Sequence, residues 1–282
     1  MTKKVNFLKN EAIALCVTFL VLSIHLANAQ QVNPIDYLER LPNRIKPDKS
    51  VKRSYQMTTD YYDFDLKTNF LVKRRFTGII SYKSDLAQWK DVFYAESKEL
   101  EAAFPIGEKI DFMQNFTYQP DEKVLTTEFF QTNLPQAHPF IMNLIWDAIA
   151  FDALAYCCWD SLELNKESRA KNMNHELEIA NIGTFENRDI RITWLGITEI
   201  NNQLCAILKY SVMNNPLKID FDDNTSMVGR SHYWGEVYVS LSDKRIEYAS
   251  LTEDIVTDVK MKGQADNMLG YTVRTIHLVK VN

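Results

Sequence analysis

The chain has 282 residues, of which 46% are hydrophobic and 24% are charged, and its mean hydropathy of -0.27 is typical of a water-soluble globular protein. This composition excludes a disordered tail, a fibre and a polytopic membrane protein. Only eight residues are glycine and no two of them form a G-x-G pattern. Glycine-rich dinucleotide fingerprints and phosphate-binding loops are therefore absent from the sequence.

The first 29 residues have the pattern of a secretory signal peptide. Three lysines precede an apolar run over residues 12–27, and Ala27-Asn28-Ala29 places small residues at the two positions that a signal peptidase reads. A membrane anchor would need about 20 apolar residues, and this run is shorter and interrupted. We therefore predict cleavage before Gln30 and an exported protein, periplasmic or extracellular.

Removal of residues 1–29, which hold three lysines and one glutamate, changes the net charge from -5 to -7. Nucleic-acid binding depends on neutralising phosphates with Lys and Arg, so this acidic chain is predicted to have no nucleic-acid partner. Residues 30–53 are an exception, because the stretch 40–53 is basic and is interrupted by two prolines. We predict a solvated linker there, and contact of residues 40–53 with headgroups at a membrane surface is the alternative.

The predicted mature chain has three cysteines, Cys157, Cys158 and Cys205. Adjacent cysteines rarely bond each other, because their Cα atoms are closer than an unstrained bridge requires. A bridge from Cys157 or Cys158 to Cys205 is compatible with the spacing, and Cys158–Cys205 is the candidate disulfide. Burial of all three thiols is the alternative, since free cysteine is among the most buried residue types.

The first structured part of the predicted domain, residues 54–82, alternates in the manner of two extended strands. Lys67-Thr68-Asn69 is predicted to be the turn between them. The following stretch, residues 85–118, has no clear period and is left unassigned.

Residues 139–159 are predicted to form one long helix that begins at Pro139, a residue suited to the first helical position. The run is apolar apart from Asn143, Asp147 and Asp152. Its length would cross a bilayer, but each central aspartate costs about 2.5 to 3.5 kcal/mol there, so we expect that it does not span a membrane. Its polar residues do not gather on one side. The helix must therefore be buried on most faces or cover something apolar.

Residues 175–281 alternate with a period of two, which indicates about seven antiparallel strands. Asn201-Asn202 and the stretch 242–245 are predicted to be hairpin turns. The connections are too short for crossover helices, so a parallel sheet is not expected. The predicted fold class is α+β, with a mainly antiparallel curved sheet, an incomplete barrel, and one long apolar helix packed on or covering it. Residues 54–282 are predicted to be a single domain.

Motifs that carry chemistry are few in this sequence. His175-Glu176 lacks the second histidine of a zinc-protease helix, and the acidic run 220–224 lacks the turn glycine of a calcium loop. We therefore predict no metal site and no cofactor, and we assign no catalytic residue. A hydrolase built from dispersed carboxylate or histidine side chains is one alternative, because such groups come together from distant segments.

The large aromatic side chains of the helix and strands have two interpretations. They form an ordinary core, or they line a cavity between the curved sheet and the helix that holds a lipid or another apolar ligand. In the second interpretation Asp152 is the partner of a polar head or a buried, protonated carboxyl group. The candidate ligand-binding residues are Trp146, Phe151, Asp152, Trp194, Trp234 and Tyr238.

A secretion signal, strands, an apolar helix ending in AYCCW and a meander containing HYWGEVYVSLSDKRIEYASL follow one another in this chain. This order resembles the exported half-barrel proteins typified by the LolA-like lipoprotein carriers. The resemblance covers about residues 50–282 and implies an incomplete barrel with a helical lid over an apolar cavity. It rests on architecture, so no functional residue is transferred from it.

The leading hypothesis is an exported, non-enzymatic protein that binds a lipid or other apolar ligand between sheet and helix. A structural or interaction module of the cell envelope, without a ligand, is the first alternative, and the hydrolase is the second. Nothing in the sequence indicates an oligomeric state.

Overall fold

The computed structural model describes residues 34–42, 50–174, 176–179, 183–222, 225–263 and 268–281. The predicted signal peptide, residues 43–49 of the basic segment and His175 lie outside the described residues. The chain divides into two compact units, Met1–Leu38 and Glu39–Asn282. The described part of the first unit contains the short 3-10 helix η1 (Pro34–Tyr37). The second unit contains the sheet and the remaining helices.

Within the part of the chain that the structure describes, the second unit is built on one antiparallel sheet of 13 strands. The strands on the N-terminal side are β1 (Arg53–Asp65), β2 (Phe70–Lys83), β3 (Leu86–Ser97), β4 (Glu108–Lys109) and β5 (Thr117–Tyr118). The strands on the C-terminal side are β6 (Glu167–Arg169), β7 (Glu176–Ile179), β8 (Gly183–Glu186), β9 (Arg191–Ile200), β10 (Gln203–Asp222), β11 (Thr225–Ser240), β12 (Ile246–Met261) and β13 (Met268–Val281).

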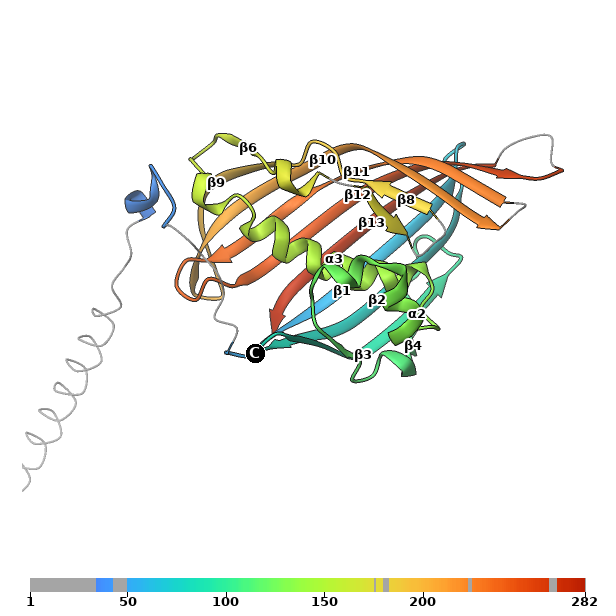
Figure 1. Cartoon of the computed structure of the whole chain (residues 1–282), viewed down its shortest axis with the longest axis horizontal. Coiled ribbons are helices and arrows are strands. Elements are labelled where there is room, and N and C mark those ends of the chain that lie inside the picture. Colours follow the sequence, from blue (N-terminus) through green and yellow to red (C-terminus); the bar gives the residue numbers. More distant parts are fainter. Residues whose placement is uncertain are drawn as a thin grey trace, which may run out of the picture. The chain divides into compact units, whose positions relative to one another are not determined.

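The sheet is curved and does not close into a barrel along the described strands. Its spatial order is β4-β3-β2-β1-β13-β12-β11-β10-β8-β7, with β5 beside β3, β9 beside β10 and β6 beside β9 (Figure 1). The first and last long strands, β1 and β13, pair along most of their length. The predicted fold class, a curved antiparallel sheet with one long helix, is confirmed.

The predicted hairpin turns are present, and the side chains explain why they form. Thr68 and both residues of Asn201-Asn202 have positive φ angles, between 51° and 64°. The Asp65 carboxylate accepts hydrogen bonds from the backbone N–H groups of Lys67 and Asn69, at 2.8 and 2.9 Å. Asparagine tolerates the left-handed region that such turns require, so these residues fix the register of the strands they join.

The strand β10 is longer than its sequence pattern indicates. The alternating segments 204–210 and 217–221 belong to one strand, whose register shifts between Val212 and Asn215. Asn214 lies at this bulge with φ of 63°. A bulge inserts an extra residue without ending the strand, which is why the period of two breaks while the pairing with β11 continues. Its first half pairs with β9 and its second half with β8.

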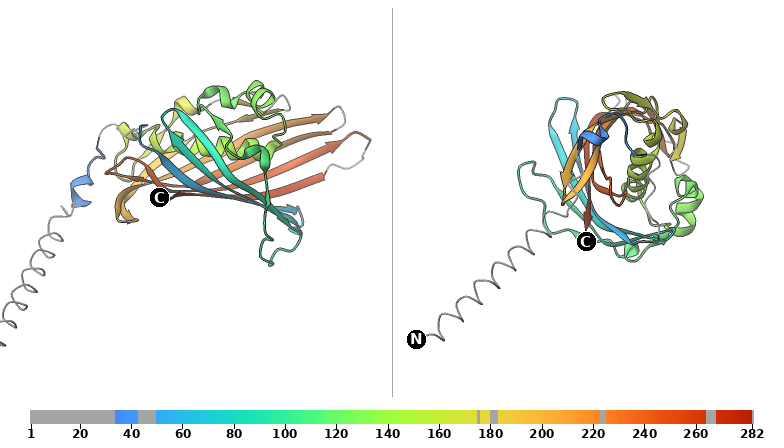
Figure 2. Two further views of the ribbon diagram at one scale, coloured as in Figure 1. Left: turned by 90° about the horizontal axis from the view of Figure 1, so that it is seen from below. Right: turned by 90° about the vertical axis from the view of Figure 1, so that its left-hand side faces the viewer.

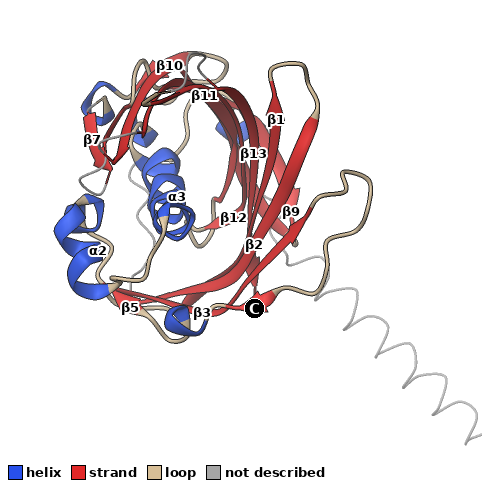
Figure 3. Ribbon diagram, turned by 90° about the vertical axis from the view of Figure 1, so that its right-hand side faces the viewer, coloured by secondary structure: helices blue, strands red, loops and turns tan. Residues whose placement is uncertain are grey.

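The long helix, α3 (Pro139–Tyr156), lies inside the bend of the sheet (Figures 2 and 3). It ends three residues before the predicted boundary, because Cys158 has φ of -116° and ψ of 7° and a 3-10 turn, η4 (Trp159–Ser161), follows. The side chains that α3 buries are Ile141, Met142, Leu144, Ile145, Asp147, Ala148, Phe151, Leu154 and Ala155. The concave side of the sheet is therefore packed against one face of α3.

Two short elements lie beside α3. They are η3 (Glu122–Leu125) and α2 (Thr127–Asn133), and Figure 3 shows α2 near the gap between the two ends of the sheet. The Thr126 side chain caps α2 by accepting a hydrogen bond from the Phe129 backbone N–H, at 3.3 Å. The Trp146 indole N–H donates to the Val124 carbonyl at 3.0 Å, which attaches η3 to α3.

Among the described residues, one helical stretch, Pro139–Ser161, is long and apolar enough to cross a membrane. Half of its most apolar part is buried inside the protein. The two aspartates within α3, Asp147 and Asp152, both form ion pairs with arginines of the sheet. This is the pattern of a core helix.

Candidate functional site

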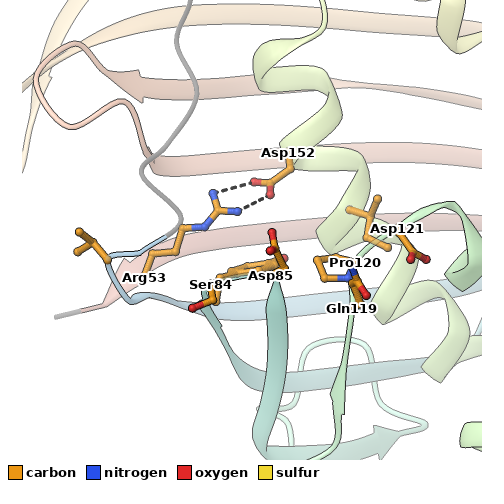
Figure 4. A pocket seen from close by; sticks show the side chains of 10 residues that line it. Arg53, Ser84, Asp85, Gln119, Pro120, Asp121 and Asp152 are labelled. Atoms are coloured by element: carbon orange, nitrogen blue, oxygen red, sulfur yellow. Dashed lines mark hydrogen bonds and ion pairs between the residues drawn. The ribbon is translucent and has the colours of Figure 1, made fainter.

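A pocket of about 250 Å³ lies where α3 faces the strands β1 and β2 (Figure 4). The residues that line it are Val51, Arg53, Tyr82, Ser84, Asp85, Gln119, Pro120, Asp121, Ile149 and Asp152. They come from the start of β1, the β2–β3 turn, the loop before η3 and the C-terminal half of α3. Because four segments converge there, the pocket depends on the tertiary fold.

A bidentate ion pair between Arg53 and Asp152 lies on one side of the pocket (Figure 4). The guanidinium Nη2 donates to Oδ2 at 2.6 Å and Nη1 donates to Oδ1 at 3.3 Å. The guanidinium also lies over the Tyr82 ring, 4.4 Å from its centroid. Such a pair has fixed geometry as well as charge, so it presents a defined polar surface to the pocket.

Burial of this pair changes the titration of its members. Desolvation raises the pKa of Asp152 above its ordinary value, although the Arg53 charge and hydrogen bonds oppose this change. Burial also raises the pKa of Tyr82 well above its ordinary value, and the nearby Asp152 charge adds to that effect. Tyr82 is therefore a neutral phenol at physiological pH.

The remaining lining residues are placed by local backbone features. Ser84 has φ of 57° in the tight turn that joins β2 and β3, which brings the adjacent Asp85 to the pocket. The Asp121 side chain caps η3 by accepting from the Lys123 backbone N–H at 3.0 Å. With Asp152, these residues give the lining three carboxylates against one guanidinium.

Next to the pocket, the side of α3 that faces away from the sheet is apolar. Trp146, Ile149, Ala150 and Ala153 are half-buried, and their spacing of three and four residues places them on one stripe of the helix. Ile149 belongs to both the stripe and the pocket. The pocket thus has a charged end at the Arg53–Asp152 pair and an apolar end at Ile149, which continues into the stripe.

Of the six predicted ligand-binding residues, Asp152 lines this pocket, and the other five are absent from its lining. Phe151 is fully buried between α3 and the sheet. Trp194 is 1% exposed, and its indole N–H donates to the Gly196 carbonyl at 2.7 Å. Trp146 packs edge-on against Phe130. Phe151 and Trp194 are thus buried side chains, whereas Trp146 is half-buried.

Trp234 and Tyr238 lie on the face of the sheet opposite to α3. Successive side chains of a strand point to opposite faces, and the buried Val237 and Val239 of β11 occupy the concave side. Tyr238 instead donates a hydrogen bond to Glu236 at 2.6 Å and packs edge-on against Tyr248. The sequence placed all these aromatics in one set because periodicity alone does not say which face of a strand meets the helix.

The candidate disulfide Cys158–Cys205 is not formed, and all three cysteines are free. Cys205 is buried in β10, where its thiol donates to the Gln203 carbonyl. Cys157 and Cys158 follow α3, half-buried, with their sulfur atoms 3.6 Å apart. The predicted alternative, burial of all three thiols, describes Cys205, whereas Cys157 and Cys158 are only partly buried.

A second buried polar cluster fastens α3 to the sheet. Arg274 of β13 donates to Asp147 of α3 at 2.9 Å and to Glu253 of β12 at 2.6 Å. All three side chains are less than 10% exposed. The Ser231 hydroxyl donates a further hydrogen bond to Glu253, so the cluster joins three strands to the helix.

Two carboxylates in this cluster share one guanidinium. Desolvation raises the pKa of Asp147 to about 7, the Glu253 charge acts in the same direction, and Arg274 opposes both. The two carboxylates raise the pKa of Arg274 well above its ordinary value although burial acts to lower it. Asp147 therefore binds and releases its proton near neutral pH.

Sequence reasoning missed Arg53 and Arg274. Arg53 was grouped with the basic segment 40–53, although it is the first residue of β1 and is engaged by Asp152. Arg274 interrupts an apolar alternation in β13, and the two aspartates of α3 were the available signal. Buried acidic groups need cationic partners, so a search for arginines at core positions of the predicted strands would have found Arg274, whereas Arg53 precedes the predicted strands, which begin at residue 54.

The described histidines do not line the pocket. His138 precedes α3, His232 accepts a hydrogen bond from the Asn214 backbone N–H at 3.0 Å, and His277 lies 2.8 Å from the Tyr248 hydroxyl. Within the described ranges, no three His, Cys, Asp or Glu side chains are grouped so that they could hold a metal ion.

No protein-family model and no curated protein sequence matches this chain. Among solved structures, one that describes lipid-protein interactions in lipovitellin matches with a TM-score of 0.34 and 12% identity, over 85% of this chain and 26% of that chain. The chain thus spans about a quarter of that protein. A receptor binding domain and the botulinum neurotoxin serotype C1 binding domain match with TM-scores of 0.14, at 10% and 9% identity. These two matches cover 81% and 83% of this chain, and 82% and 84% of theirs. Because all three TM-scores are below 0.5, the function is argued from the pocket itself.

Proposed function

We propose that this protein binds a small amphipathic molecule, without catalysing a reaction, in the pocket between α3 and the β1–β2 side of the sheet. The observation that carries the proposal is the pocket that joins the Arg53–Asp152 pair to Ile149 and the apolar stripe of α3. Ligand sites are typically concave and apolar with a few placed polar groups. The polar head would lie at the ion pair and the hydrocarbon part along the helix.

The volume of the pocket limits the size of the ligand that it can hold. About 250 Å³ is below the usual range of about 300 to 1,000 Å³ for sites that enclose a drug-sized ligand. A complete lipid therefore does not fit within it. A headgroup or a short alkyl segment fits, with the remainder of the molecule lying on Trp146, Ile149 and Ala153. Each methylene removed from water contributes about 0.8 kcal/mol, so even a short tail supplies measurable affinity.

The charge of the lining favours a cationic head. Asp85, Asp121 and Asp152 outnumber Arg53, and Arg53 already has a carboxylate partner. A carboxylate ligand would have to displace Asp152 from that guanidinium, and the displaced carboxylate would then be poorly solvated. An ammonium group is attracted by the net negative charge of the lining.

Three probes of equal chain length test the proposal: octylamine, octanol and octanoic acid at pH 7. Binding to protein purified without detergent is measured by calorimetry and native mass spectrometry. We expect octylammonium to bind at least about tenfold more tightly than octanoate, with octanol between them. If octanoate binds equally well, the head assignment is wrong; if none of the three binds, the proposed function is wrong.

Variants locate the binding. Asp152→Asn removes one negative charge from the lining and is expected to weaken octylammonium binding about tenfold while octanol binding stays the same. Trp234→Phe changes an aromatic residue on the opposite face of the sheet and serves as the matched control. Equal loss of binding in both variants would indicate that the probe binds elsewhere.

A second candidate function is an interaction module that carries no ligand. The filling of the concave side favours it, because Leu144, Ile145 and Phe151 of α3 are almost completely buried against the sheet. The three probes decide between the two functions, since an interaction module has no reason to select among their head groups.

We further propose that the protein acts after export, on the strength of the signal-peptide pattern in residues 1–29. Expression with an epitope tag at the C-terminus, followed by cell fractionation and intact-mass measurement, tests this. The expected product begins at Gln30 and lies outside the cytoplasm. Full-length protein retained in the cytoplasm would contradict it.

A further inference from the structure

The end of α3 carries two adjacent thiols that neither the core nor the pocket uses. Cys157 is the last residue with helical backbone angles, and Cys158 has left the helix. Both are half-buried and free. Their sulfur atoms are 3.6 Å apart, with the Cys157 thiol donating a hydrogen bond to Cys158.

A disulfide between these two residues would be strained. The Cα atoms across a trans peptide bond are about 3.8 Å apart, whereas disulfides usually join Cα atoms separated by about 4.4 to 6.8 Å. Strain of this kind makes a bond easier to reduce. Cys205 offers no alternative partner, because it is fully buried within β10 and donates to the Gln203 carbonyl. Cys157 and Cys158 are thus held as a pair of thiols.

The separation of the two sulfur atoms suits a single bridging atom. Two metal–sulfur bonds of about 2.3 Å at a tetrahedral angle hold their sulfur atoms about 3.8 Å apart. The observed distance of 3.6 Å is close to this value. Little movement is therefore needed for both thiols to bind one centre.

The position of the pair at a helix C-terminus favours a positively charged ligand. The helix macrodipole places a partial negative charge there, which stabilises cations within the last turn. Soft thiolate ligands select thiophilic metals over hard cations.

We propose that Cys157 and Cys158 form a chelating dithiol site that takes one soft, thiophilic metal or metalloid centre. This site is separate from the pocket, whose lining contains neither cysteine. Its function does not depend on whether the pocket binds a ligand.

Phenylarsine oxide is the probe, because its trivalent arsenic binds two neighbouring thiols. The reaction breaks two S–H bonds and the arsenic–oxygen double bond, forms two As–S bonds and releases water, with no change of oxidation state. The full predicted mature chain is reduced, freed of reductant and treated with one equivalent of the probe. We expect one phenylarsenic group per chain, removed by a dithiol such as 2,3-dimercaptopropanol and retained in the presence of a monothiol.

Serine variants identify the residues. Cys157→Ser and Cys158→Ser are each expected to lose the dithiol-specific adduct, while Cys205→Ser keeps it as the matched control. Should a serine variant fail to fold, tryptic mapping of the wild-type adduct answers the same question. No Lys or Arg lies between Lys123 and Lys166, so a single peptide carries both cysteines, whereas Cys205 lies on another. An adduct that maps to Cys205, or no adduct on the reduced protein, would overturn the proposal.

Discussion

Arg274 and Asp147 join the last strand of the sheet to the long helix through the interior of the protein. The guanidinium Nη1 donates to the carboxylate Oδ2 at 2.9 Å, and both side chains are less than 10% exposed. On β13, Arg274 pairs across the sheet with Glu253 of β12 and with Tyr61 of β1. The position of α3 on the concave side is therefore tied to the three strands at the middle of the sheet.

This cluster makes the stability of the protein depend on pH. Asp147 has a pKa of about 7 in the folded protein and about 3.8 when unfolded, so the folded state binds the extra proton between these values. Stability is therefore expected to fall as pH rises from about 4 to about 7, by up to about 4 kcal/mol from this group. Asp147→Asn keeps a neutral side chain at every pH. Urea unfolding should therefore show the stability of Asp147→Asn rising relative to that of the wild type as the pH is raised from about 4 to about 7.

The matched control for that measurement is Asp111→Asn, which changes an exposed carboxylate far from the cluster in the sequence. Its pH dependence is expected to follow that of the wild type. If Asp147→Asn also follows the wild type at every pH, Asp147 is ionised throughout and the assigned proton is wrong.

Removal of Arg274 should cost much more than removal of a comparable arginine at the surface. Arg274→Met leaves Asp147 and Glu253 buried without a cation, which is expected to lower the free energy of unfolding by about 3 to 5 kcal/mol at pH 8. At pH 5 the loss should be smaller, because a protonated Asp147 needs no counter-charge. Arg74 is a more exposed arginine that pairs with Asp63 and Glu96. Arg74→Met should therefore lower the free energy of unfolding by about 1 kcal/mol or less. Equal losses in chemical unfolding would contradict a buried role for Arg274.

The sequence predicted the strands and the helix better than it predicted the site. The β1–β2 turn and the Asn201-Asn202 turn follow from local backbone preferences, which a few adjacent residues determine. The pocket instead needs Arg53 and Asp152, which are 99 positions apart and meet only after the sheet has curved around α3. No periodicity contains that information.

The choice between core and ligand-binding aromatics was open for a related reason. Alternation assigns Trp234 and Tyr233 to opposite faces of β11, but it does not say which face meets α3. The structure answers this with buried partners, since Tyr233 donates to Asn187 and packs against Tyr210, while Tyr238 pairs with residues of the convex face. Asp152 was identified because a charge on an apolar helix is informative without any knowledge of the sheet.

A larger side chain at Ile149 should close the proposed binding pocket. Ile149 is half-buried and lines the pocket beside Asp152, so Ile149→Phe adds volume at its apolar end and leaves the inward face of α3 unchanged. We expect octylammonium binding to fall at least about tenfold in calorimetry, with little change in the melting temperature. Leu195→Phe, on an exposed position of β9, is the control and should bind as the wild type does. Unchanged binding in Ile149→Phe would place the ligand elsewhere.

Truncation of two aromatic residues from the predicted ligand-binding set should lower the free energy of unfolding by different amounts, because one is buried and the other lies at the surface. Phe151 is a fully buried residue of α3. Phe151→Ala removes apolar contacts and leaves a cavity, which typically lowers the free energy of unfolding by about 3 to 5 kcal/mol. Tyr238 lies on the convex face and bonds to Glu236 and packs on Tyr248, so Tyr238→Ala should cost about 1 kcal/mol. Urea unfolding of both variants gives the comparison. Because the Phe151 side chain faces the sheet and the pocket lies beside Asp152, residual folded Phe151→Ala protein should still bind octylammonium. Loss of binding without loss of stability in that variant would return Phe151 to the ligand site.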